Sequence, residues 1–175
     1  FLGYMAKGGA TYNINEHHFV FGNLGYFEKA PYNTFVFLNN TNVVNPVVKN
    51  ENVTSFELGY GYRSKTFTAN LNLYTTSWDN RSLRPFSQRD AAGLTYYANI
   101  NGVNEEHTGA ELEVLYKLNS KLRVNGMISV GDWKYSNNVN NVQVFDDANN
   151  VVGKPFSVYL KDVKVGDAAQ TTAAF

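Results

Sequence analysis

Residues 45–78 read NPVVKNENVTSFELGYGYRSKTFTANLNLYTTSW, and the second half of this stretch decides the fold. From Ser55 to Arg63 every second residue is apolar or aromatic, and the same period returns from Phe67 to Tyr74. A period of two places the apolar residues on one face of a strand. The connection 64–66 is too short for anything but a tight turn, so the stretch predicts a β-hairpin. Each strand has about nine to eleven alternating residues, which is the length that a tilted strand needs to cross a bilayer.

The residues that lead into this hairpin resemble a signature of TonB-dependent outer-membrane receptors. In that family the pattern N-P-x-x-K-x-E-x-x-x-S-x-E-x-G precedes a barrel strand, and it is met here by Asn45-Pro46, Lys49, Glu51 and residues 55–59. Asn50 stands where the family commonly has proline, which removes a turn-rigidifying residue but leaves the strand unchanged. Asn99-Ile100 followed by residues 108–113 (TGAELE), and residues 165–172 (VGDAAQTT), also resemble the family, so the resemblance spans most of the chain. It implies an all-β fold, an antiparallel up-and-down transmembrane β-barrel of about 22 strands with a plugged lumen.

Tight and long connections alternate along the whole chain. The tight turns are expected near residues 15–18, 64–66 and 119–121, and the long, Asn-rich connections at about 33–54, 79–107 and 136–154. Because successive antiparallel strands run in opposite directions, all tight turns lie at one end of the sheet and all long loops at the other. Outer-membrane barrels have this asymmetry. Poor alternation from Lys161 to Asp167 predicts a bulge or register change in the last strand.

Composition narrows the class of protein further. Aromatic residues reach 15% and charged residues only 17%, below the roughly 25% of soluble domains. Asn, Thr, Ser and Gly supply the polarity, which suits a wet lumen and surface loops. The net charge of zero argues against nucleic acid as a partner. The chain has no cysteine, and no apolar run approaches the ~20 residues of a spanning helix.

The two faces of the predicted strands should meet different surroundings. The residues expected to face lipid are Leu58, Tyr60, Tyr62, Phe67, Leu71, Leu73, Leu112, Val114 and Tyr116. The candidate lumen-facing and substrate-binding residues are Asn70, Asn72, Tyr74, Glu111 and Glu113. Trp78 and Trp133 fall at the loop ends of their strands, where an aromatic belt would lie at the outer membrane interface.

No set of residues has the spacing of a catalytic or metal site. Glu111 and Glu113 are two apart on a strand and point to the same side, but no nucleophile, base or orienting group accompanies them, so we expect them to line the lumen. His17 and His18 are adjacent and point to opposite faces, so they do not chelate one ion as a pair. Residues 146–150 (DDANN) offer oxygens for calcium, yet they lack the glycine and distal glutamate of an EF-hand. We therefore predict no enzyme activity, no cofactor and no obligatory metal.

The resemblance implies a function in the outer membrane of a Gram-negative cell. It implies active import of a scarce nutrient of the siderophore, vitamin or glycan type, energised by TonB. The implied partners are outer-membrane lipid, the receptor's own plug domain, the TonB complex and a small-molecule or oligomeric nutrient, and a surface lipoprotein is an open option. Two alternatives remain. One is a soluble lipocalin-like barrel with its apolar face inward around a greasy ligand, and the other is a passive porin or adhesin barrel without a plug.

Residues 1–175 are expected to be a fragment of such a barrel domain, with the plug domain not present. The hairpins supply about six to eight strands, whereas closing a barrel takes at least about eight. An open sheet edge in lipid leaves backbone groups unsatisfied, which costs several kcal/mol for each group. We therefore expect the barrel to continue past Phe175. The first and last strands should lie at opposite edges of a curved sheet.

Overall fold

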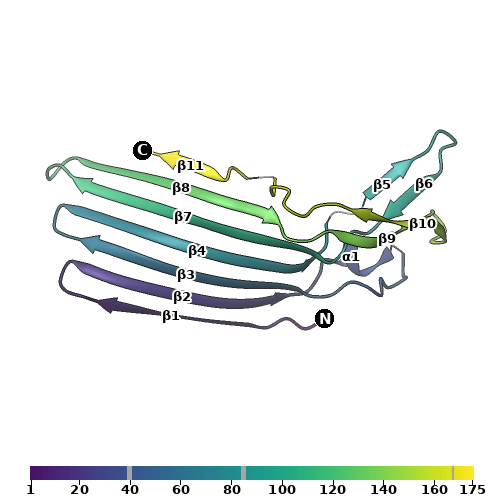
Figure 1. Cartoon of the computed structure of the whole chain (residues 1–175), viewed down its shortest axis with the longest axis horizontal. Helices are drawn as coiled ribbons and strands as arrows, with labels where there is room; N and C mark the ends of the chain where they lie inside the picture. Colours follow the sequence, from purple (N-terminus) through teal and green to yellow (C-terminus); the bar gives the residue numbers. More distant parts are fainter. Residues whose placement is uncertain (39–40, 84–85, 167) are drawn as a thin grey trace.

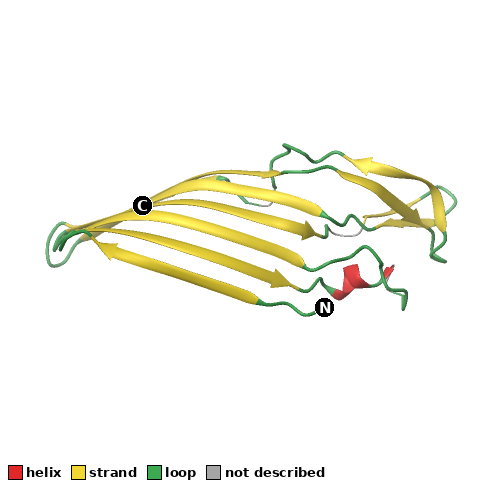
Figure 2. Ribbon diagram, turned by 60° about the horizontal axis from the view of Figure 1, so that its bottom comes forward, coloured by secondary structure: helices red, strands yellow, loops and turns green. Residues whose placement is uncertain are grey.

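The computed structural model describes residues 1–38, 41–83, 86–166 and 168–175, and its main element is a seven-stranded antiparallel sheet (Figure 1). The strands of this sheet are β1 (Met5–Asn13), β2 (His18–Lys29), β3 (Glu51–Arg63), β4 (Phe67–Arg81), β7 (Val103–Lys117), β8 (Arg123–Tyr135) and β11 (Thr171–Ala174). They lie in the order β1-β2-β3-β4-β7-β8-β11. The sheet is curved and open, with β1 and β11 at opposite edges, as predicted (Figure 2).

The predicted alternation of connections is confirmed. Figure 1 shows the three tight turns at one end of the sheet and the long connections at the other. Backbone hydrogen bonds close the turns: the amides of Ile14, Ser64 and Leu118 donate to the carbonyls of His18, Phe67 and Leu122 at 2.8, 2.7 and 3.0 Å. The end with the tight turns is called the turn end below, and the opposite end is called the loop end.

The register of the central strands separates an apolar face from a polar face. Leu71 lies between Tyr60 on β3 and Leu112 on β7, whereas its neighbour Asn72 lies between Gly59 and Glu111. Leu71 is 42% exposed, while Asn72 is half-buried on the more crowded, polar face. A sheet in a water-soluble protein buries its apolar face, whereas here the apolar face is the more exposed of the two. The pattern fits a wall that meets lipid on one side, and it argues against the lipocalin-like alternative.

Glycines on β3 leave room for aromatic rings on the polar face. Phe21 of β2 lies opposite Gly59, and Phe19 lies opposite Gly61. A Cβ atom built on Gly59 would lie 2.0 Å from the ring of Phe21, and one on Gly61 would lie 2.0 Å from the ring of Phe19. The two rings therefore rest directly on the backbone of β3, which only glycine permits at these positions.

Replacement of Gly59 by alanine is therefore expected to destabilise the sheet by about 1 to 3 kcal/mol, because the ring of Phe21 must leave its position. The measurement is the free energy of unfolding of the receptor in urea with lipid vesicles. In the double variant Gly59→Ala/Phe21→Ala the clash is absent, so the two single effects should not add. Strictly additive effects would contradict the proposed contact.

The long connections are not simple loops, and this part of the sequence-based prediction was wrong. They contain β5 (Phe86–Arg89), β6 (Thr95–Ala98), β9 (Val139–Phe145) and β10 (Val151–Val158), which form a second sheet in the order β10-β9-β6-β5 at the loop end. A small core of Ala98, Val103, Val139 and Val142 holds this layer against β7. The connection between β2 and β3 carries a single helical turn, α1 (Asn33–Val36). Within the described residues, no helix has both the length and the apolar character needed to cross a membrane.

Two hairpin tips of the second sheet are closed by an aspartate. Asp90 Oδ1 accepts hydrogen bonds from the amides of Ala92 and Leu94, each at 2.9 Å. Asp146 Oδ1 likewise accepts from the amides of Ala148 and Asn150, at 2.9 and 2.8 Å. The hydrogen bond from Leu94 lowers the pKa of Asp90, because it stabilises the charged carboxylate. Asp146, which the sequence analysis weighed as a calcium ligand, thus uses its Oδ1 to close its own hairpin turn.

The expected register change in the last segment is confirmed. Lys164 bridges to Lys134, whereas Thr171 pairs with Val130, so seven residues of this segment span four residues of β8. Asp167 of the predicted range lies outside the described residues. Gln170 spans the interruption: its Oε1 accepts from the amide of Trp133 at 3.1 Å, and its Nε2 donates to the Trp133 carbonyl at 2.9 Å. The side-chain amide thereby replaces a rung of the backbone ladder.

Candidate functional site

The sequence-predicted substrate-binding residues share the polar face of β4 and β7. Asn70 pairs with Glu113 and Asn72 with Glu111 in the strand register, and Tyr74 lies two residues further toward the loop end. The three β4 side chains are half-buried, and both glutamates are exposed. The structure therefore brings these residues together in one strip along the wall. Their role in substrate binding stays a prediction.

Tyr74 is the point where this strip meets a cluster of rings. Its hydroxyl accepts a hydrogen bond from Trp133 Nε1 at 2.9 Å. Gly109 and Gly131 provide the space, because a Cβ atom on Gly109 would lie 2.4 Å from the Tyr74 hydroxyl and one on Gly131 would lie 2.7 Å from Trp133 Nε1. The glycines of β7 and β8 thus let Tyr74 and Trp133 lie flat against the wall.

Trp78 and Trp133 lie on the polar face, which corrects their assignment to a lipid-facing belt. Trp133 pairs with His107, which is on the same face as Glu111, and Trp78 pairs with Glu105. The imidazole of His107 stacks on Trp133 with ring centroids 5.2 Å apart and planes 13° apart, and it lies 6.2 Å from the ring of Trp78. Tyr74, Trp78, His107 and Trp133 are called the mouth cluster below.

A row of aromatic side chains does lie on the apolar face, but at the turn end. Tyr62 contacts Phe67 with ring centroids 5.9 Å apart, and Phe67 contacts Tyr116 at 6.4 Å. His18 joins the row, because its Nδ1 lies 2.5 Å from the Tyr60 hydroxyl. Aromatic girdles at the edges of the lipid-facing band are typical of outer-membrane barrels. This row has the position of such a girdle, whereas the sequence analysis had expected an aromatic belt at Trp78 and Trp133.

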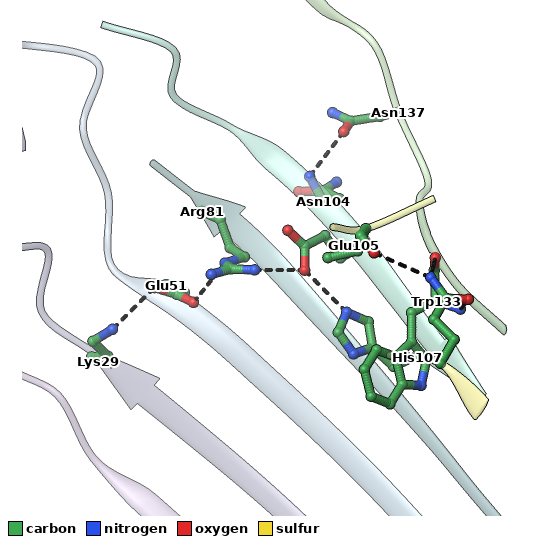
Figure 3. A network of polar contacts seen from close by, with 10 residues as sticks. Lys29, Glu51, Arg81, Asn104, Glu105, His107, Trp133 and Asn137 are labelled. Carbon is green, nitrogen blue, oxygen red and sulfur yellow. Dashed lines mark hydrogen bonds and ion pairs between the residues drawn. The ribbon is translucent and has the colours of Figure 1, made fainter. Parts of the chain in front are cut away.

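A chain of charged side chains crosses four strands beside the mouth cluster (Figure 3). Lys29 Nζ of β2 lies 3.4 Å from Glu51 Oε2 of β3, and Glu51 Oε1 lies 3.3 Å from Arg81 Nε of β4. Arg81 Nη1 donates to Glu105 Oε2 of β7 at 2.5 Å. Glu105 Oε2 is also 3.0 Å from His107 Nε2. The signs alternate along this charged ladder, so each carboxylate lies between two nitrogen-bearing groups.

Glu105 is the most buried member of the ladder. It is 2% exposed, and its Oε1 has no hydrogen-bond partner among the described residues. Arg81 reaches it because the register shifts between Trp78 and Arg81, where Asn80 adopts a φ of 59°. The guanidinium of Arg81 lies 5.0 Å from the centre of the Trp78 ring. The ladder and the mouth cluster therefore form one connected site at the loop end.

Sequence reasoning missed Arg81, Glu105 and His107 as site residues because they fell in a predicted loop. The missed signal is the period of two, which continues back from Glu111 to Gly109, His107 and Glu105. All of these positions lie on one face of β7.

The site can offer a ligand flat aromatic faces, hydrogen-bonding amides and fixed charges of both signs. Trp78 and Trp133 are half-buried, so part of each ring is open to solvent. Such a surface is suited to binding by stacking and hydrogen bonding.

An open antiparallel sheet with an exposed apolar face and a polar face that carries a site defines part of a membrane-spanning β-barrel. Residues 3–163 match the family model described as TonB dependent receptor-like, beta-barrel, and the chain belongs to this family. Neither the curated proteins nor the solved structures contain a match to the chain. Proteins of this family are nutrient transporters of the outer membrane and not enzymes.

Proposed function

We propose that this chain forms part of the wall of an outer-membrane receptor that imports a scarce nutrient of the siderophore, vitamin or glycan type, driven by TonB. The observation that carries the proposal is the family match over residues 3–163. The exposed leucines of β3 and β4 support contact with lipid. The partners are then outer-membrane lipid, the receptor's own plug domain and the TonB complex.

The barrel proposed here needs strands beyond the seven of the main sheet. The outer edges of β1 and β11 have no partner strand within the described residues. In a bilayer such edges leave backbone groups without hydrogen bonds, which is costly. Further strands of the same receptor satisfy both edges in this proposal, and its plug domain fills the lumen.

The mouth cluster and the charged ladder are proposed to contact the nutrient on its way into the lumen. Both lie on the polar face at the loop end, where the long connections meet the wall. The short turns mark the periplasmic side in outer-membrane barrels, so the loop end is the extracellular side. A nutrient that arrives from outside therefore reaches the mouth cluster before the strip of Asn72 and Glu111.

The proposal is tested by uptake in the bacterium that carries the gene. Growth of a strain with the gene deleted is compared with wild type on a panel of limiting nutrients, and uptake of the affected nutrient is then followed with a labelled form. Uptake should be lost when TonB is inactivated. Uptake that continues without TonB would identify a passive porin instead.

The variant Trp133→Ala should lower uptake at least about tenfold, because it removes the stacked ring and the hydrogen bond to Tyr74. The amount of receptor at the cell surface is measured in parallel. The matched control is Tyr116→Ala, which removes an aromatic side chain from the apolar face at the turn end. Equal losses of uptake in the two variants at equal surface amounts would contradict a specific role of the mouth cluster.

A further inference from the structure

A second pocket lies in the loop layer, outside the main sheet. It has a volume of about 470 Å³, within the range of small-molecule sites, and it shares no residue with the mouth cluster or the charged ladder. Its walls come from the β2–β3 connection, the end of β4, the segment after β6, and β9. The pocket is therefore built mainly by the connections that the sequence analysis predicted to be long and rich in asparagine.

Asparagine and glutamine are the most frequent polar residues in the lining of this pocket. Asn80, Asn99, Asn140, Asn141 and Gln143 all line it, and their side-chain amides have no hydrogen-bond partner within the described part of the chain. Other asparagines of the lining already make hydrogen bonds with their side chains. For example, Asn45 donates to the Phe35 carbonyl at 3.1 Å and accepts from the Val47 amide at 3.2 Å. The free amides are thus a distinct set, and each offers two donors and an acceptor.

The backbone holds two of these amides in uncommon conformations. Asn80 and Asn141 both have a φ of 59°, in the left-handed region that few non-glycine residues adopt. Asn80 lies in the register shift of β4, and Asn141 lies in β9 beside the irregular pairing with β10. Asparagine is one of the few non-glycine residues that adopt this region readily, so it suits both irregular positions.

The charge of the lining limits the class of ligand. Lys49 is the one charged residue among the described residues that line the pocket, and no carboxylate of the described chain lines it. A metal cation or a cationic ligand lacks a counter-charge there. Neutral amides match hydroxyl groups, because a hydroxyl both donates and accepts a hydrogen bond. Phe145 and Leu38 supply apolar surface for the C–H face of a ring.

We propose that this pocket binds a neutral saccharide at the outer surface of the receptor. The inference rests on the proposed function only in placing the loop end outside the cell. The five residues with free amides come from three separate segments of the chain, at β4, after β6 and on β9, so a compact ligand can meet them from more than one side. An extended peptide is better matched by a row of groups along one strand edge.

The test measures binding of glycans to the full-length receptor purified in detergent. An array of neutral glycans identifies the best ligand, and calorimetry then gives its affinity for wild type and variants. The pocket variant is Asn99→Ala/Asn140→Ala/Gln143→Ala, which spares the two asparagines with positive φ. The control is Asn13→Ala, at the turn end of β1. Removal of each amide should weaken binding about fivefold, and together they should weaken it at least about 50-fold, with no change for the control.

Several results would overturn this inference. One is the absence of binding to any neutral glycan of the array by a receptor that still imports its nutrient, which would leave the proposed function intact. Another is binding that the pocket variant retains but Trp133→Ala loses, because this would place the saccharide at the mouth cluster. Preferential binding of an unstructured peptide such as tetra-alanine over every glycan would identify a peptide site instead.

Discussion

Arginine at position 71 is expected to destabilise the barrel by about 2 to 4 kcal/mol in a bilayer, whereas arginine at position 70 should cost little. Leu71 lies at the middle of the apolar band, between Tyr60 and Leu112. An arginine side chain at this position must move its charge from water into the hydrocarbon of the bilayer, which costs free energy. Asn70 is its neighbour in sequence and lies on the polar face opposite Glu113, which can pair with an arginine.

The pair Leu71→Arg and Asn70→Arg is well matched, because the same residue is introduced on the same strand one position apart. The free energy of unfolding is measured in urea with the full receptor inserted in lipid vesicles. Equal stability of the two variants would show that the Leu71 side of the sheet does not face lipid. A reversed order, with Asn70→Arg the more costly, would revive a barrel with its apolar face inward.

The main sheet could be predicted because its strands follow from patterns among residues that are close together in the sequence. β3 and β4 follow from an alternation that can be counted along the chain, and the short turn between them leaves one way to pair them. The same counting places Leu71 and Asn72 on opposite faces of β4, as the register of the sheet confirms. The family resemblance agreed with this and was confirmed by the match over residues 3–163.

The second sheet could not be predicted, because its strands are short and their partners are distant. β6 has four residues, too few to show a period, and it pairs with β9 more than forty residues later in the chain. Long-range pairings of this kind depend on the core around Val103 and Val142, which no local pattern reveals. The Asn-rich pocket of the loop layer could not be predicted for the same reason.

The tryptophans show a different kind of error. Trp78 was assigned to the membrane-interface belt because it lies close to a loop. In a regular strand, however, residues an odd number of positions apart lie on opposite faces, so Trp78 lies opposite to Leu71 and on the same face as Asn72. Glu105 was not identified as a site residue because the strand that became β7 was expected to begin only after His107. Counting the period to its limits places both residues on the polar face, but the ladder from Lys29 to His107 needs the register of four strands.

The variant Glu105→Ala is expected to lower the free energy of unfolding by about 2 to 3 kcal/mol. Removal of one partner of a buried ion pair costs roughly 3 to 5 kcal/mol, since the other charge is left without a partner. The cost is smaller here because the side chain of Arg81 is 33% exposed and keeps Glu51 at 3.3 Å. Loss of the carboxylate also frees His107, so the stacking with Trp133 should loosen and uptake should fall.

The matched control is Lys29→Ala, which shortens the same ladder at its exposed end. The side chain of Lys29 is 45% exposed and lies 3.4 Å from Glu51, so its removal should change stability by less than about 1 kcal/mol. Tryptophan fluorescence should change in Glu105→Ala and stay constant in Lys29→Ala, because Glu105, unlike Lys29, contacts the imidazole that stacks on Trp133. If both variants unfold at the same urea concentration as wild type, the buried carboxylate does not organise the mouth, and the rings hold their positions through packing on Gly109 and Gly131 alone.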